Sequence, residues 1–313
     1  MDTNQDTYRT RMGLFGDLPT RAMTWALQKS PNMPLWVEAS LLHFFTFIVF
    51  MLARQQRESI RRNLCVIHDD LAFFEGYVWT FLVFRNFGWT YIDSLRTRLG
   101  QDVVSWSIEG EEHFSKMREN TGAAILFTTH TGNYDLAAAL FAPEFRRTLH
   151  TVRMPERTQS LQAIREKELT EDTTSQDHLK VHYNKPDNLL GIELANILSQ
   201  GELVAVQCDR VIGQVVELAI PLANRAETLR VPKGPLTLAC FAKCPCYPLY
   251  VVRERFRHYR IIFRPAIVPD TENRRVREMD YGRAWSKELM GFLERHSRQW
   301  FVFEDAFNLT DIK

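Results

Sequence analysis

The chain has 313 residues, of which 45% are hydrophobic and 25% are charged, so it is long and apolar enough to bury a full core in one or two domains. Its formal net charge of +1 excludes the marked basic excess of a dedicated nucleic-acid binder. Five cysteines, an odd number, and a polar start without the features of a secretory leader predict a reducing compartment.

The N-terminal third contains a nearly continuous apolar stretch, SLLHFFTFIVFMLA, at residues 40–53. It is shorter than the roughly 20 residues that a membrane-spanning helix needs. The stretch therefore fits a tilted single span, a helix lying in the membrane interface, or a helix packed in the core. Arg54, Arg57, Arg61 and Arg62 follow directly, and a basic cluster after an apolar segment is typical of a cytoplasmic membrane face.

A row of aromatic side chains comes next. Phe73, Tyr77, Phe81 and Phe84 recur at helical spacing and predict a helix with one aromatic face. Such a face fits packing in a core, and it also fits contact with a membrane or an acyl chain, because aromatic rings tolerate a half-wet interface. We expect residues 1–106 to form a membrane-associated helical region.

From residue 107 onward, strands and helices alternate. The pattern predicts strands at residues 122–129, 149–154, 202–208, 246–256 and 258–267. It predicts helices at residues 111–120, 133–141, 157–172, 188–201, 231–244 and 281–297, followed by an apolar tail. The alternation predicts one α/β core over residues 107–313, with a central, mostly parallel sheet flanked by helices.

Two clusters of potential metal ligands lack a complete ligand set. Cys240, Cys244 and Cys246 lie close together, but no fourth ligand follows at a familiar spacing, so we expect no metal there. His178 and His182 occupy a polar stretch, where we expect solvated surface histidines.

The loop after the apolar segment at residues 123–127 carries the strongest chemical signal. His130 is expected between a buried strand and a helix, with Asp135 in the first turn of that helix. A histidine whose second ring nitrogen bonds a carboxylate can act as a general base. The loop has no serine or cysteine, so the nucleophile would be a substrate hydroxyl. A loop histidine with a purely structural hydrogen bond is the alternative.

The segment GEEHFSKMRENTGAAILFTTHTGNYDLAAALF resembles the H-x4-D/E block of the bacterial lysophospholipid acyltransferase superfamily. Within that superfamily it is most similar to the late, lauroyl or myristoyl, acyltransferases of lipid A biosynthesis. IRRNL, FRNFGWTYIDSL, GELVAVQCDRV, VPKGPLTLACFAKCPCYPLYVVRE and RQWFVFEDAF also occur in the order of that family. The resemblance implies a glycerol-3-phosphate acyltransferase-like fold. It implies transfer of a fatty acyl group from an acyl carrier protein or coenzyme A thioester to a hydroxyl of a lipid acceptor, with no other cofactor.

The resemblance also implies roles for individual residues. His130 would deprotonate the acceptor hydroxyl, and Asp135 would orient His130. Arg210 would bind acceptor phosphate or steady the oxyanion. It could instead pair with Asp209, itself a candidate for substrate binding, or with another local acid.

Further candidates for substrate binding lie at two predicted helix starts. Lys233 and Gly234 would offer a charge and backbone amides to a phosphate, or they form a simple tight turn. Asn133, in the loop of His130, is the last candidate.

The implied setting is the cytoplasmic face of the inner membrane, on a surface with anionic lipids. The acceptor would be a lipid A precursor or a related glycolipid or lysophospholipid, while HTGNYD and CDRV look closer to relatives that acylate other glycolipids or aminolipids. N-acylation of an aminolipid, thioester hydrolysis with the same residues, and non-catalytic lipid binding at a membrane remain alternatives.

Overall fold

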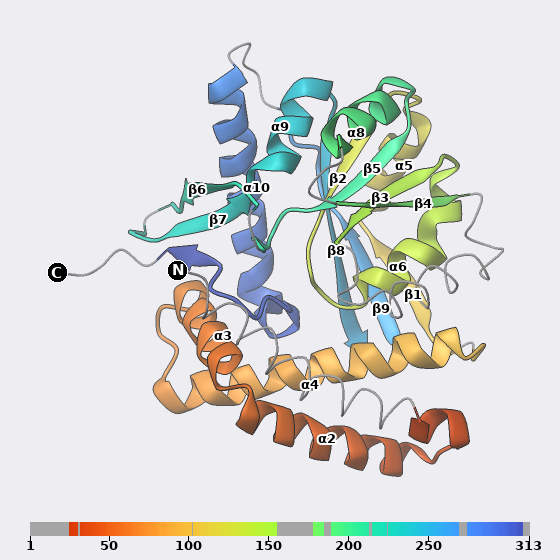
Figure 1. Ribbon diagram of the computed structural model, residues 1–313, viewed down its shortest axis with the longest axis vertical. Coiled ribbons are helices and arrows are strands. Elements are labelled where there is room, and N and C mark those ends of the chain that lie inside the picture. Colours follow the sequence, from red (N-terminus) through yellow and green to blue (C-terminus); the bar gives the residue numbers. More distant parts are fainter. Residues whose placement is uncertain are drawn as a thin grey trace.

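The computed structural model describes residues 25–30, 32–101, 103–154, 178–184, 189–212, 215–223, 225–268 and 274–308. Helices α2, α3 and α4 precede an α/β body (Figure 1). The helical elements are α2 (Leu35–Leu52), α3 (Arg54–Ile67), α4 (Phe73–Arg98), α5 (Glu111–Glu119), α6 (Tyr134–Phe141), η1 (Ala142–Phe145), α8 (Leu190–Ser199), α9 (Lys233–Ala242), α10 (Arg274–His296) and η2 (Ser297–Gln299).

The central sheet has seven strands in the order β1-β9-β8-β2-β5-β3-β4. Its strands are β1 (Ser105–Glu109), β2 (Ala124–Thr128), β3 (Leu149–Arg153), β4 (Leu179–Tyr183), β5 (Leu203–Gln207), β8 (Cys246–Arg255) and β9 (His258–Phe263). All neighbours pair in parallel except β8 and β9, which form an antiparallel pair. The mostly parallel α/β class predicted from the sequence is confirmed.

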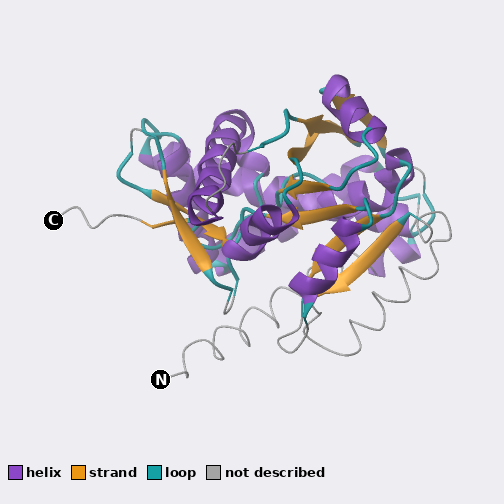
Figure 2. Cartoon of the chain, turned by 90° about the horizontal axis from the view of Figure 1, so that it is seen from above, coloured by secondary structure: helices purple, strands orange, loops and turns teal. Residues whose placement is uncertain are grey.

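Helices cover both faces of this sheet (Figure 2). Strand β2 shows why, because its side chains alternate between two cores. Ile125 and Phe127 pack with α8, α9 and α10, whereas Leu126 packs with α5, α6 and η1. The apolar run of β2 is therefore buried on both faces, as a central parallel strand requires.

The N-terminal helices form a layer along one edge of the body. Helix α4 contacts both α2 and α3, and its aromatic row is divided between two environments. Phe84 is buried against Phe50 and Phe303, whereas Phe73 is exposed. The boundary expected at residue 107 falls inside strand β1, which begins at Ser105.

A second, three-stranded antiparallel sheet was not predicted. It joins β6 (Glu217–Pro221), β7 (Thr228–Pro232) and β10 (Phe307–Asn308) in the order β10-β7-β6. The closing helix α10 begins at Arg274, earlier than predicted. The helix predicted at residues 157–172 lies outside the described residues.

The second histidine of the polar stretch is not solvated, so that prediction was wrong. His182 lies on strand β4, where its Nε2 is 2.8 Å from Nδ1 of His150 and its Nδ1 is 2.8 Å from Oε1 of Glu193. Strand β4 lies at the edge of the sheet, and its polar residues resembled a solvated surface stretch. His178 lies just before β4 and is partly buried.

The three neighbouring cysteines, Cys240, Cys244 and Cys246, are buried free thiols. They pack among the apolar side chains of one core, and burial raises the pKa of the Cys244 thiol to about 11. Among the described residues, no group of three His, Cys, Asp or Glu side chains is arranged to hold a metal ion.

Candidate active site

The loop of His130 leaves the carboxyl end of the central strand β2 and enters helix α6. Gly132 gives the loop its shape, because its φ of 51° favours glycine. A Cβ atom there would also lie 2.4 Å from the carbonyl oxygen of Val251 on strand β8. The loop is therefore pressed against the sheet, and His130 is only 9% exposed.

Asp209 is the carboxylate that faces His130. Nδ1 of His130 lies 2.8 Å from Oδ1 of Asp209, and the backbone N–H of His130 donates to Oδ2 at 2.8 Å. The indole N–H of Trp300 donates to the same Oδ2, also at 2.8 Å. Because Nδ1 faces the carboxylate, we place the ring hydrogen on Nδ1, which makes Nε2 the basic nitrogen.

The charge state of Asp209 follows from its partners. The side chain is fully buried, and burial alone would raise the pKa of its carboxyl group. The nearby charge of His130 and the hydrogen bonds from His130 and Trp300 outweigh this effect, so the pKa of Asp209 lies below its ordinary value. Asp209 is therefore ionised at neutral pH and can stabilise a protonated His130.

The predicted pairing of His130 with Asp135 is corrected by this geometry. Asp135 lies in the first turn of α6, and its Oδ1 is 3.1 Å from a guanidinium nitrogen of Arg153, at the end of strand β3. The predicted substrate-binding role of Asp209 is corrected as well, because both its carboxylate oxygens bond groups of the protein.

Asn133 caps helix α6 instead of facing a substrate. Its Oδ1 accepts hydrogen bonds from the hydroxyl of Ser94 at 2.8 Å and from the backbone N–H of Leu136 at 3.4 Å. Its Nδ2 donates to the carbonyl of Thr90 at 3.3 Å. Asn133 is almost fully buried, so it ties the loop of His130 to helix α4.

The cationic candidates make ion pairs within the protein. The guanidinium of Arg210 bonds Glu304, with Nε donating to Oε2 at 2.8 Å, so its partner is Glu304 and not Asp209. Lys233 lies at the start of α9 with its Nζ 3.8 Å from Oε2 of Glu278, and Gly234 follows it in the first turn.

The C-terminal segment braces the loop from the other side. The backbone N–H of Phe301 donates to the carbonyl of His130 at 2.7 Å, and that of Gly132 donates to the carbonyl of Gln299 at 3.3 Å. Trp300 sits between these contacts and bonds Asp209. Trp300 belongs to the motif RQWFVFEDAF, but the sequence did not predict its role.

An apolar pocket lies beside His130, between α6 and the sheet. Its cavity volume is about 80 Å³, and it is partly open to solvent. The ring of Tyr134 forms part of its wall and packs edge-on against His130, with 5.2 Å between ring centroids. Most of its other lining is apolar and includes Leu126, Ala137, Ala138, Phe141, Phe145, Leu149, Val152, Ala205, Leu249, Val251 and Ile261.

The pocket could not be read from the sequence, because its lining comes mostly from five strands and from the two consecutive helices α6 and η1. Asp135 and Arg153 also line it, so their ion pair borders the apolar space. A buried His–Asp pair thus lies at the carboxyl edge of the α/β sheet, next to an apolar pocket, which is where α/β proteins commonly bind their ligands.

The chain belongs to the bacterial lipid A biosynthesis acyltransferases, because the model of that family matches residues 22–308. The resemblance noted from the sequence is thereby confirmed. No curated protein matches the chain. Among solved structures, the 1-acyl-sn-glycerophosphate acyltransferase PlsC from Thermotoga maritima is similar at 12% identity and a TM-score of 0.38, covering 83% of this chain and 98% of that one.

Proposed function

We propose that the protein transfers a fatty acyl group from a thioester, carried by an acyl carrier protein or coenzyme A, to a hydroxyl of a lipid acceptor. The observation that carries this proposal is the His130–Asp209 pair next to the apolar pocket, in a chain of an acyltransferase family. A general base and a hydrophobic cavity are the two parts that acyl transfer to an alcohol requires.

The pair supports a cycle in which one proton is transferred twice through one nitrogen. Nε2 of His130 takes the proton of the acceptor hydroxyl while the oxygen attacks the thioester carbonyl carbon. When the tetrahedral intermediate collapses, the C–S bond breaks and the thiolate takes the proton from His130. Asp209 holds the ring and stabilises the imidazolium between these steps.

The pocket would hold the acyl chain of the donor. Its apolar lining replaces water around the hydrocarbon, and each buried CH₂ group contributes about 0.8 kcal/mol. Tyr134 lines the pocket and its ring contacts His130. An acyl chain inside the pocket would therefore place the thioester carbonyl carbon near Nε2 of His130. The ion pair of Asp135 and Arg153 would fix the start of α6 against β3 and so keep the shape of this wall.

Three cationic or amide positions are proposed to contact polar parts of the substrates. Arg210 follows Asp209 directly, and two of its five N–H groups go to Glu304, which leaves others for an acceptor phosphate or the oxyanion. Lys233 and Gly234, at the start of α9, would bind a second phosphate group of the acceptor lipid.

We place the reaction at the cytoplasmic face of the inner membrane, because donor thioesters are made in the cytoplasm and lipid acceptors lie in the bilayer. A lipid A precursor or a related glycolipid or lysophospholipid is the proposed acceptor. The family membership supports this choice.

Mass spectrometry of lipids from cells with and without the gene tests the proposal. When the gene is deleted, we expect the mass of one lipid to fall by that of one ester-linked fatty acyl group. A lipid that changes by an amide-linked chain would indicate N-acylation. An unchanged lipid profile together with a rise in acyl thioesters would indicate a hydrolase.

A further inference from the structure

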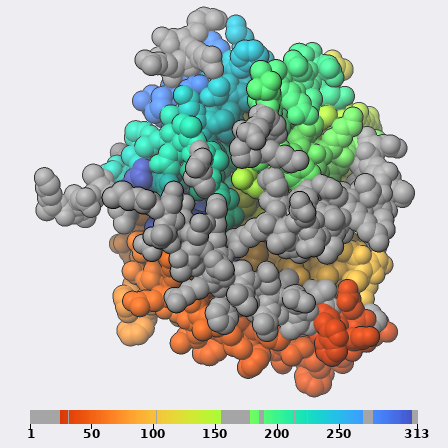
Figure 3. Space-filling view, viewed as in Figure 1, coloured from red at the N-terminus to blue at the C-terminus, as the bar shows by residue number. Residues whose placement is uncertain are grey.

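The outer face of helix α2 is apolar along its length, and it points away from the body. Figure 3 shows α2 and α3, in red and orange, along the lower border of the molecule. Six large apolar side chains on α2 are at least half exposed: Leu35, Trp36, Phe44, Phe47, Met51 and Leu52. Exposed Phe73 and Phe74, at the start of α4, are two more aromatic residues at this edge.

Two exposed polar side chains on α2 bond the helix itself. The hydroxyl of Ser40 donates to the carbonyl of Trp36 at 2.7 Å, and Nδ1 of His43 bonds the carbonyl of Ala39 at 2.6 Å. In hydrocarbon the same groups must find partners within the protein.

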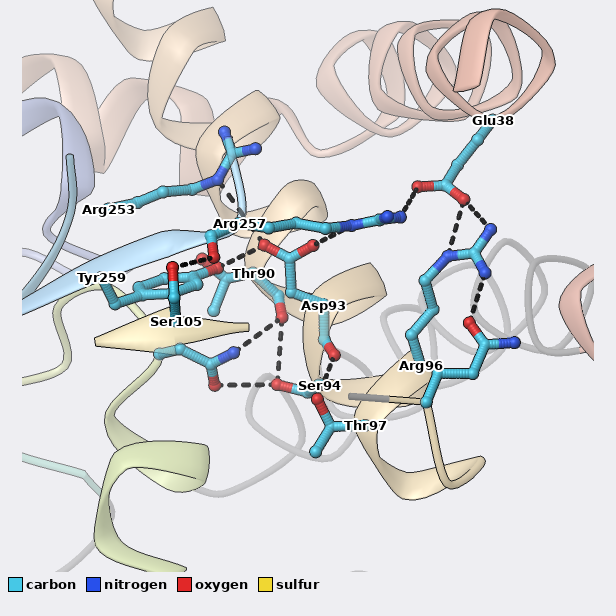
Figure 4. Close-up of polar contacts among 12 residues, drawn as sticks. Glu38, Thr90, Asp93, Ser94, Arg96, Thr97, Ser105, Arg253, Arg257 and Tyr259 are labelled. Carbon is cyan, nitrogen blue, oxygen red and sulfur yellow. Dashed lines mark hydrogen bonds and ion pairs between the residues drawn. The ribbon is translucent and has the colours of Figure 1, made fainter. Parts of the chain in front are cut away.

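The one charged residue of α2, Glu38, is turned inward and fully buried (Figure 4). Its Oε2 accepts from Nε of Arg96 at 2.7 Å, and its Oε1 accepts from Arg257 at 2.9 Å. Arg257 also lies 3.5 Å from the buried Asp93, which bonds the hydroxyl of Tyr259 at 2.6 Å. This chain of contacts fastens α2 through α4 to the strand pair β8–β9.

Apolar contacts continue the attachment along α2. Leu42 and Thr46, one and two turns after Glu38, are buried against Gly88 of α4, where a Cβ atom would lie 2.6 Å from Leu42. Helix α2 therefore lies along α4 over several turns (Figure 1).

The two ends of this helix carry exposed cations. Lys29 precedes α2 and Arg54 follows it, and Glu38 is the only ionisable acid within α2. Of the four arginines predicted to form a basic cluster, Arg57 and Arg61 pair with Glu58 and Arg62 pairs with Asp305. Cations at the ends of an apolar face match anionic headgroups at the border of a bilayer.

We infer that α2 binds one leaflet of a bilayer by lying in the membrane plane, and that it does not cross the membrane. Its length, composition and hydropathy would permit a span. To form one, however, the helix would have to leave α4, and Arg96 and Arg257 would lose the buried carboxylate of Glu38.

The apolar face of α2 lies on the side of the body that carries the loop of His130. Helix α4 lies between α2 and the loop of His130, which it holds through Ser94 and Asn133. A leaflet on the outer face of α2 would therefore lie on the same side of the body as the loop of His130, with α2 and α4 between them. The inference itself concerns only docking and does not rest on the proposed acyl transfer.

Binding of the full-length protein to vesicles of phosphatidylethanolamine and phosphatidylglycerol tests the surface. The double variant Phe44→Glu and Phe47→Glu should bind at least about tenfold more weakly, because each phenyl group would otherwise be buried in lipid. Phe241→Glu is the matched control, since Phe241 is 67% exposed on α9, away from α2. Unchanged binding of the double variant would overturn the inference. So would a dimer in the absence of vesicles that the double variant dissociates, because the face would then bind a second copy.

Labelling distinguishes lying in the membrane from crossing it. Single cysteines replace the exposed Gln28 and Gln55, on either side of α2, and a membrane-impermeant maleimide is added to inside-out native membrane vesicles. The parent chain provides the background from its own cysteines. We expect both positions to react from the cytoplasmic side. Reaction of one position only after detergent opens the vesicles would show a span and contradict the inference.

Discussion

His130 and Asp209 are 79 residues apart in sequence, yet Nδ1 and Oδ1 lie 2.8 Å apart. Strands β2 and β5 are parallel neighbours, and Thr128 at the end of one is in register with Gln207 at the end of the other. Each functional residue stands two positions beyond its strand end. The sheet register therefore assembles the pair.

Replacement of Asp209 should lower the rate of catalysis more than replacement of Asp135. Asp209→Asn keeps the shape but removes the charge that stabilises the imidazolium, so we expect kcat to fall by about 10² to 10⁴. Asp135→Asn weakens the ion pair with Arg153 and leaves the His130–Asp209 contact in place, so it should lower kcat less. Steady-state kinetics of both variants checks this, and a larger loss for Asp135→Asn would restore Asp135 as the partner of His130.

Trp300 should act as a positioning residue. Trp300→Phe removes the indole donor to Asp209, a hydrogen bond to a charged group, and should lower kcat about ten- to a hundredfold. Because the pKa of Asp209 should rise in this variant, the acidic limb of the plot of kcat against pH should shift to higher pH. A loss of stability with an unchanged profile would assign Trp300 to packing alone.

Acyl-chain preference should respond to the volume of the pocket. Ala205→Leu fills space between β5 and α6 with a larger side chain, so the enzyme should prefer shorter acyl thioesters. Competition among saturated acyl-coenzyme A donors of different lengths measures this. An unaltered preference would mean that the acyl chain binds elsewhere.

Burial, followed by the charges of His182 and Lys180, lowers the pKa of His150 to about 4 from its ordinary 6.5. Between these two values the unfolded chain binds a proton at this site and the folded chain does not. The contribution of His150 to the free energy of unfolding should therefore be greatest above pH 6.5 and should decline as the pH falls toward 4. Urea unfolding across this range should show a weaker decline for His150→Asn, in which an amide N–H replaces the Nδ1 donor. An identical decline would exclude His150 as its source.

The Glu38 contacts should stabilise the whole fold. Glu38→Leu leaves Arg96 and Arg257 without their buried carboxylate, which should cost about 3–5 kcal/mol of unfolding free energy. Glu75→Gln, at an exposed acid of α4, should change it by less than about 0.5 kcal/mol. Equal unfolding midpoints for the two variants would contradict the role of the network.

The regular part of the fold could be read from local sequence. The apolar run ending at Phe127 and the polar residues after it predict the strand and the loop of His130. A carboxylate close in sequence then seemed the natural partner, but the start of α6 turns Asp135 toward Arg153. Asp209 carried a usable signal, because it follows a buried strand as His130 does, and the carboxyl ends of parallel strands meet at one edge.

Features made by distant segments could not be read in this way. The small sheet of β6, β7 and β10 unites the C-terminal tail with a hairpin some 80 residues earlier, and short antiparallel strands have a weak local pattern. The apolar stretch of α2 left three arrangements open, because periodicity does not reveal whether Glu38 finds its partners in Arg96 and Arg257. The pocket needs strands whose order only the folded sheet provides.

The most direct test of acyl transfer by His130 follows both products at once. The purified protein is given an acyl-coenzyme A or acyl carrier protein thioester together with a bacterial lipid extract, and free thiol and acylated lipid are measured in the same sample. We predict equal amounts of both, a loss of about 10² to 10⁴ in rate for His130→Ala, and normal rates for His113→Ala on α5. Thiol release without acylated lipid, or full activity of His130→Ala, would contradict the account.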